Sequence, residues 1–237
     1  MFDAKKLLDQ FLGSQMGGQL GGKSGDLLGK AGQFGDIARN NPWKTAGIAA
    51  ALLGTKTGRK LAGNVATVGG LAAIAGLGYL AYKNYQSGQA PQTVAHKEPE
   101  ILPPPADSPF NPQSPALTND FALTLIRAMI AAAKADGHID AAERANIMDK
   151  VHAVDLGSEA EAFIANELAN PLDIDDLVAA ARTEEQKVEL YTATRLTIDP
   201  DTRAERGYLD LLAGRLGLPD ALLDHIDATV SAAKVQA

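Results

Sequence analysis

The stretch "LTNDFALTLIRAM" (Leu117–Met129) decides the fold class of the C-terminal half of this 237-residue chain. Its apolar residues Leu117, Phe121, Leu125 and Met129 recur every four positions, which places them on one face of an α-helix. No stretch beyond it alternates apolar and polar residues for long enough to be a strand. The sequence therefore predicts an all-α fold.

Further helical patterns follow this first one along the chain. About seven short helices over roughly 120 residues are typical of a compact bundle. We therefore predict a single all-α domain over residues 117–237. Its later helices are expected around residues 147–154, 158–168, 173–182, 184–196, 202–216 and 222–233.

Several of these helices begin with a polar residue that is followed three positions later by Glu or Gln. In such a capping box the two side chains satisfy free N–H groups at the start of a helix. We expect this arrangement at four places: Asp140 with Glu143, Ser158 with Glu161, Thr183 with Gln186, and Thr202 with Glu205.

Two acidic loops contain more aspartate than capping requires. These are "KADGHIDAAER" (Lys134–Arg144) and "IDPDTRAER" (Ile198–Arg206). Capping leaves Asp136, Asp199 and Asp201 unexplained. Calcium and magnesium prefer oxygen ligands, and three carboxylates from each loop would supply most of such a shell if the loops converged. The two interpretations, helix capping alone or a divalent-cation site, both remain open at this point.

The stretch "LAGNVATVGGLAAIAGLGYLAY" (Leu61–Tyr82) contains no charged residue and lies between Lys60 and Lys83. A helix of this length spans about 33 Å, enough for the hydrocarbon core of a bilayer. The alternative is a buried core helix, but no other N-terminal segment is long enough to form a core around it. We therefore predict a transmembrane helix over residues 61–82.

The segments on either side of this helix differ from the C-terminal domain in composition. Residues 1–60 are rich in glycine and carry nine Lys and Arg against four Asp and Glu, whereas the rest of the chain carries thirteen against twenty-five. We predict a basic, flexible segment with a short amphipathic helix at 1–12. Eight of the twelve prolines fall within residues 91–115, which predicts an extended linker over residues 83–116.

Several functional classes lack support. The stretch "GGQLGGKS" (Gly17–Ser24) matches the phosphate-binding P-loop pattern, but no strand precedes it, so we expect no nucleotide. The chain has no cysteine and no histidine pair at zinc-binding spacing, although His138, His152 and His225 are present. The acidic C-terminal part is unsuited to nucleic acid. No catalytic constellation is visible, so we expect no enzyme.

The motifs "KADGHIDAAE" and "TIDPDTRAERGYLDLLAGRLGL" (Thr197–Leu218) resemble the TerB-like domain of tellurite-resistance proteins. With "LGYLAYKNYQ" (Leu77–Gln86) and the Pro-rich linker, the whole layout is similar to the DUF533 (YebE-like) family of bacterial inner-membrane proteins. The resemblance implies an all-α domain with a metal site, although the second motif lacks the glycine of the first. The metal ligands it implies are Asp136, Asp140, Glu143, Asp199, Asp201 and Glu205.

Two hypotheses about function follow. In the first, a single-pass protein of the bacterial inner membrane presents a helical domain that binds calcium or magnesium, for envelope stress or signalling. In the second, the carboxylates only cap helices, and the bundle is a metal-free adaptor for a protein partner. The lipid bilayer is an expected partner in both. The side of the membrane on which the C-terminal domain lies stays open.

Overall fold

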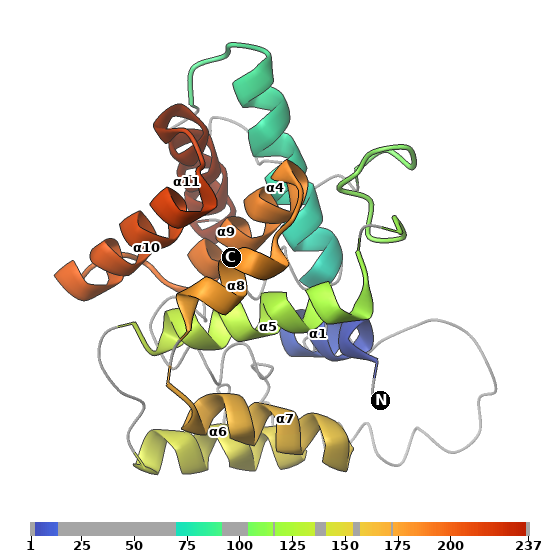
Figure 1. The fold of residues 1–237 in the computed structure, drawn as a ribbon, viewed down its shortest axis with the longest axis vertical. Helices are drawn as coiled ribbons and strands as arrows, with labels where there is room; N and C mark the ends of the chain where they lie inside the picture. The colour runs from blue at the N-terminus through green and yellow to red at the C-terminus, as the bar shows by residue number, and fades with distance from the viewer. Residues whose placement is uncertain are drawn as a thin grey trace.

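The structure, a computed structural model, describes residues 3–13, 70–91, 104–115, 117–135, 141–153, 157–171 and 173–235. These residues contain helices, turns and no strand, so the prediction of an all-α fold is confirmed (Figure 1). The helices are α1 (Ala4–Gly13), α4 (Gly70–Gln86), α5 (Asn119–Ala133), α6 (Ala141–Ala153), α7 (Ser158–Ala169), α8 (Ile174–Ala180), α9 (Glu184–Thr197), α10 (Arg203–Leu216) and α11 (Asp220–Val235).

Helix α9 lies at the centre of the molecule. It contacts α4, α5, α10 and α11, and every residue from Val188 to Ile198 is buried. A helix that is covered on all sides is normally apolar throughout. Helix α9 instead carries several buried polar side chains, among them Glu189 and Arg195.

Helix α4 is a core helix of this assembly. It packs against α9 and α11, and Leu71, Ile74 and Leu77 are each at most 4% exposed. Gly78 allows a close approach, because a Cβ atom there would lie 3.4 Å from the Val188 side chain. Helices α9 and α11 of the C-terminal part, together with α1, thus supply the surroundings in which α4 is buried.

This packing bears on the predicted transmembrane helix over residues 61–82. The described part of that segment, from Gly70 onward, is covered by other helices of the same chain, and residues 61–69 lie outside the described ranges. None of the helices within the described ranges is both long enough and apolar enough to cross a membrane. The membrane span and the inner-membrane location stay predictions.

The core also extends beyond the predicted domain boundary at residue 117. Helix α1 packs on α4 and α5, where the backbone N–H of Ala4 donates to Asn119 Oδ1 at 2.7 Å. In the predicted linker, Phe110 is 2% exposed and its ring packs against those of Tyr79 and Tyr82. The described residues before 117 are therefore part of the same hydrophobic core as the C-terminal helices.

The helix starts follow the predicted capping pattern at two places. Thr183 with Gln186 and Thr202 with Glu205 both form complete capping boxes. The box predicted at Ser158 is wrong, because α7 begins after Gly157, whose φ of 83° suits a residue without a side chain. The side chains of the fourth pair, Asp140 and Glu143, lie outside the description.

Replacing Thr183 by alanine should lower the free energy of unfolding by about 1 kcal/mol, because α9 then loses the acceptor for the Gln186 N–H. Urea denaturation followed by circular dichroism measures this change. Thr183→Ser keeps the hydroxyl and serves as the control. If the alanine and serine variants were equally stable, the cap would contribute nothing measurable.

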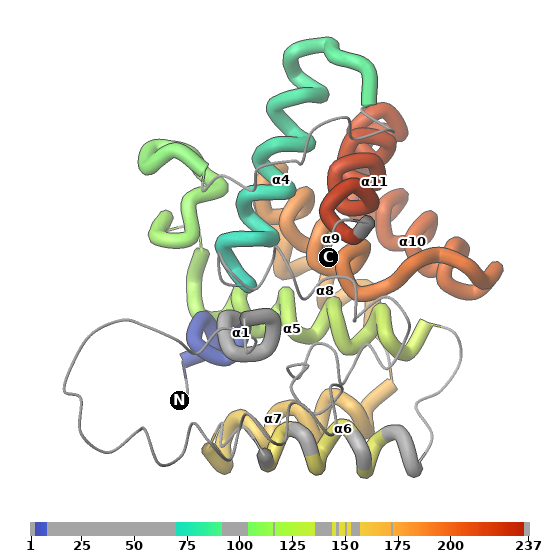
Figure 2. The backbone as a smooth tube through the Cα atoms, turned by 180° about the vertical axis from the view of Figure 1, so that it is seen from behind, coloured from blue at the N-terminus to red at the C-terminus, as the bar shows by residue number. Residues whose placement is uncertain are grey.

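Helices α6 and α7 form a separate layer beneath α5 (Figures 1 and 2). Of the two, α7 makes the larger contact with α5, and α6 packs mainly on α7. Ile164 and Leu168 of α7 are buried, as is Val151 of α6. The border between this layer and the rest of the molecule holds a cavity of about 430 Å³.

Candidate binding cleft

A cleft of about 430 Å³ lies between α5, α7 and α8. Its apolar lining comes from Ile130 and Ala131 of α5, from Leu177 and Ala180 of α8, and from Pro171 between α7 and α8. The remaining lining is polar and includes Arg127, Lys134, Asn166, Glu167, Asn170, Asp173 and Asp176. Pockets of this volume are large enough to hold a small molecule or a few side chains of a partner.

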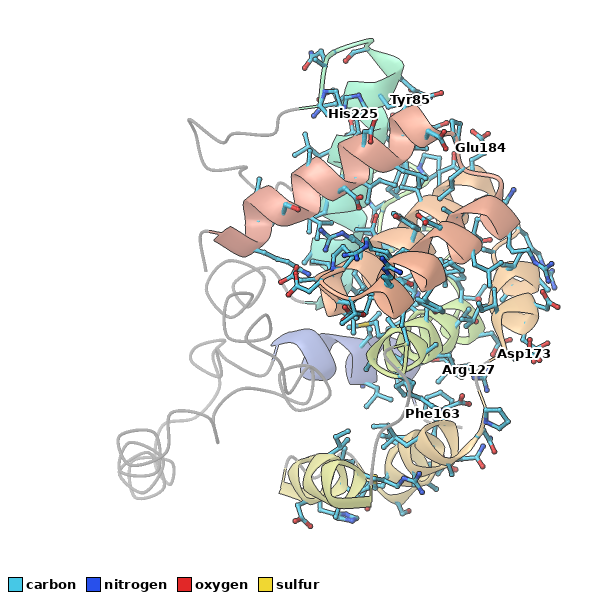
Figure 3. The ribbon with its side chains drawn as sticks, turned by 90° about the vertical axis from the view of Figure 1, so that its left-hand side faces the viewer. Tyr85, Arg127, Phe163, Asp173, Glu184 and His225 are labelled. Carbon is cyan, nitrogen blue, oxygen red and sulfur yellow. The ribbon has the colours of Figure 1, made fainter. Side chains whose placement is uncertain are left out.

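Arg127 lies on α5, and Lys134 is the C-cap residue of that helix, seven positions or about two turns later, so both lie on the side that faces α7. Arg127 Nε donates to Glu167 Oε1 at 2.8 Å. The guanidinium also lies over the Phe163 ring, 5.3 Å from its centroid (Figure 3). These contacts join α5 to α7 along one wall of the cleft.

The Lys134 ammonium lies against the C-terminal end of α7. It donates to the backbone oxygen of Glu167 at 3.3 Å and to that of Asn170. The last carbonyls of a helix have no partner within the helix and carry partial negative charge, so a cation stabilises them. Burial lowers the pKa of Lys134, while the nearby Glu167 carboxylate opposes this shift.

Asp173 forms the opposite wall, at the start of α8 (Figure 3). Its Oδ1 accepts hydrogen bonds from the N–H groups of Asp175 and Asp176 at 3.0 and 3.1 Å, and so caps the helix. The Asp176 side chain is exposed, and Asp175 pairs with Arg215 of α10. The fold thus fixes the carboxylate of Asp173 at the edge of the cleft.

A second charged arrangement lies at the C-terminal end of α9, away from the cleft. Arg195 is 6% exposed and donates to Asp227 Oδ1 at 3.0 Å, to the Ile198 backbone oxygen at 2.7 Å and to Ser231 Oγ at 3.2 Å. This arrangement fastens α11 to the end of α9.

Lys234 completes this cluster. This lysine is 3% exposed, and its ammonium donates to the backbone oxygens of Arg195 and Ile198 at 3.0 and 2.9 Å, and to Asp199 Oδ1 at 2.8 Å. Burial and the neighbouring Arg195 lower the pKa of Lys234 to about 8, although Asp199 works in the opposite direction. The two buried cations thus connect the end of α9 to α11 through ion pairs and hydrogen bonds.

The predicted metal ligands are distributed as follows. Asp136 and Asp140 lie outside the described residues, as does the side chain of Glu143. Asp199 already pairs with Lys234 and lies 3.4 Å from Arg195, while the Glu205 carboxylate accepts from the Thr202 N–H in its capping box.

Asp201, the last of the six, is exposed. Within the described ranges, three or more His, Cys, Asp or Glu side chains nowhere gather as a metal would require. Because half of the set lies outside those ranges, the calcium or magnesium site stays a prediction.

The other motifs from the sequence have these positions. The P-loop match at Gly17–Ser24 and His138 lie outside the described residues. His152 Nδ1 lies 3.0 Å from Glu161 Oε2 between α6 and α7. His225 is buried, with its ring 6.2 Å from that of Tyr85 (Figure 3).

The sequence analysis missed both charged arrangements, although each left a signal. Lys234 continues the series Leu222, Ile226, Val230 at spacing four, so it occupies a position on the buried face of α11. Arg127 interrupts the apolar run of α5 that follows Thr124, and Lys134 comes directly after that helix. A cation at an apolar position is a signal of a buried or interhelical contact.

Comparison with known proteins identifies the family. Residues 36–230 match the family described as "Protein of unknown function (DUF533)", which covers more than four fifths of the chain. A relative from Yersinia enterocolitica, described as "Uncharacterized protein in ampR 5'region", is 30% identical over 124 residues, which are 52% of this chain and 89% of the relative. No solved structure matches the chain. The TerB-like and YebE-like parts of the resemblance stay predictions, whereas the broader result is plain: the chain belongs to the DUF533 family.

Proposed function

We propose that the protein is a non-enzymatic helical adaptor, which binds a protein partner in the cleft between α5, α7 and α8. The observation that carries this proposal is the cleft itself, about 430 Å³ in volume and lined by apolar and charged side chains from three helices. Protein interfaces typically combine an apolar centre with a polar rim, and arginine is enriched in them.

Two further features support this function. The walls of the cleft are fixed before any partner binds, because Arg127 and Lys134 connect α5 to α7 and Asp173 caps α8. A binding surface that is already ordered loses less conformational entropy on association. In addition, α7 contacts the rest of the molecule mainly through α5, so the side-chain contacts of Arg127 hold the α7 wall of the cleft in place.

The divalent-cation hypothesis leads to a different experiment. Isothermal titration of the full chain with calcium or magnesium should give a saturable signal if the two acidic loops form a site. Asp136→Asn and Asp140→Asn should then abolish that signal. The adaptor proposal does not require any such binding.

Site-specific photo-crosslinking in living cells tests the adaptor proposal. Benzoylphenylalanine placed at Asn170, at the edge of the cleft, should capture one defined protein that mass spectrometry can identify. The control position is Ala221, which is exposed on α11. Equal capture from both positions, or none from Asn170, would contradict the proposal.

Filling the cleft should weaken binding of the captured partner. Ala180→Trp places a large side chain into the lining, and we expect the dissociation constant to rise by about tenfold or more, which corresponds to about 1.4 kcal/mol. Ala221→Trp adds the same side chain at the remote exposed position and should leave affinity unchanged. Calorimetry with the purified proteins provides both values, and an unchanged affinity for Ala180→Trp would place the partner elsewhere.

A further inference from the structure

The charges of the cleft are not equally available to a partner. The Arg127 guanidinium already pairs with Glu167 and lies over Phe163, and the Lys134 ammonium already donates to two backbone oxygens. Asp173 and Asp176, by contrast, form no ion pair with any described cation. The charge left for a partner is therefore negative.

The shape of the cleft adds a second requirement. Pro171 is exposed and Ala180 is half-buried, so these two residues offer apolar surface in the lining, whereas Ile130 and Leu177 beneath them are only 2% and 3% exposed. The amides of Asn166 and Asn170 provide acceptor oxygens near the edge. A ligand that matches this lining has an apolar stem and a cationic end.

Arginine and lysine side chains have this composition, because a chain of methylene groups carries their charged end. A divalent cation matches less well, since calcium requires six to eight oxygen ligands and the free carboxylates here are two. The negative end of the α7 dipole adds to the attraction for a cation, even though Lys134 already occupies part of it.

We infer that the cleft binds an arginine or lysine side chain of a protein partner, with its aliphatic stem against Pro171 and Ala180 and its cationic end at Asp173 and Asp176. This inference rests on the proposed adaptor function and specifies the chemistry of the partner. The charge of the chain agrees with it, because an overall net charge of −7 attracts a basic segment.

Titration of the full-length, nitrogen-15-labelled protein tests this inference by nuclear magnetic resonance. The probe is the blocked peptide acetyl-Gly-Ala-Arg-Ala-Gly-amide, compared with peptides in which citrulline or glutamate replaces the arginine. We expect saturable shifts of amide signals from the cleft-lining residues. Citrulline, which keeps the shape and loses the charge, should bind about tenfold more weakly, and higher salt should weaken the arginine peptide.

Matched variants locate the charge that is recognised. Asp173→Asn with Asp176→Asn removes both free carboxylates, and asparagine at 173 still caps α8. This pair should weaken the arginine peptide about tenfold. Asp210→Asn with Asp224→Asn makes the same change in net charge at exposed positions on α10 and α11, and should have no effect.

Four outcomes would overturn the inference: equal binding of the citrulline peptide, tighter binding of the glutamate peptide around Arg127, shifts confined to another surface, and no saturable binding. The crosslinking experiment separates these from failure of the adaptor function. If a protein is captured at Asn170 but the arginine peptide is not preferred, the adaptor function stands and the recognition of a basic side chain is refuted. Binding of the arginine peptide without capture at Asn170 refutes the adaptor and retains the basic site.

Discussion

Glu189→Gln should stabilise the protein by about 3–5 kcal/mol at pH 9 and by much less at pH 5. Glu189 lies on the central helix α9, is 3% exposed, and no hydrogen bond or ion pair joins its carboxylate to another described residue. Burial, reinforced by the nearby Glu185, raises the pKa of Glu189 from 4.5 to about 8.

The sign of the effect follows from this raised pKa. The folded state favours the protonated acid, so the contribution of Glu189 is fully present below about pH 4.5 and is lost as pH rises toward 8. Above that pH, the wild-type protein must hold an unpaired buried carboxylate, whereas glutamine stays neutral.

Urea denaturation of both proteins at pH 5, 7 and 9 measures the difference, because groups that do not interact with Glu189 titrate alike in the two chains. Glu185→Gln, one turn earlier at a half-exposed position, is the control and should show only a small part of the effect. A stability difference that does not change with pH would mean that Glu189 has a partner or is hydrated.

Arg195→Ala should destabilise the protein by about 3 kcal/mol or more, because it removes the donor to the Asp227 carboxylate and to the Ser231 hydroxyl and creates a cavity beside α11. The free energy of unfolding from urea denaturation at pH 7 tests this value. Arg195 repels the Lys234 ammonium and so lowers the pKa of that lysine. Removing Arg195 relieves this repulsion, which offsets part of the lost stability.

Arg127→Ala is the matched control for this substitution. Arg127 also pairs with a carboxylate, but its side chain is 46% exposed, and exposed pairs contribute about 1 kcal/mol or less. Equal losses in the two variants would show that the cluster at the end of α9 is no more important than a surface pair.

Much of the helical arrangement was predictable from local patterns. Leu117, Phe121, Leu125 and Met129 are all buried, as the spacing of four predicted. The capping boxes at Thr183 and Thr202 mark the starts of α9 and α10. Such signals depend on residues within one or two turns of each other, so a single sequence contains them.

The position of α4 was harder to infer, because its composition alone is compatible with two environments, a lipid bilayer and a protein core. A run of Gly, Ala and Leu between two lysines suits a bilayer and also suits a tightly packed protein core. The choice depends on whether α9 and α11 cover it, and these helices lie about a hundred residues or more away in the sequence.

The cleft could not be predicted for a related reason. Its lining combines residues from α5, α7 and α8, and only their relative placement brings Arg127, Glu167 and Asp173 to one space. The acidic loops were predicted to form a metal site because, within each loop, the carboxylates are close in sequence. In the structure, however, Asp199 belongs to an ion-pair cluster with Lys234, and the cleft lies elsewhere.

Amide hydrogen exchange of the full chain, with and without the partner captured at Asn170, tests the central claim most directly. Binding in the cleft predicts slower exchange in residues 124–134 and 166–180, with unchanged exchange over α10 and α11. Protection confined to α10 and α11, with no change around the cleft, would contradict the account.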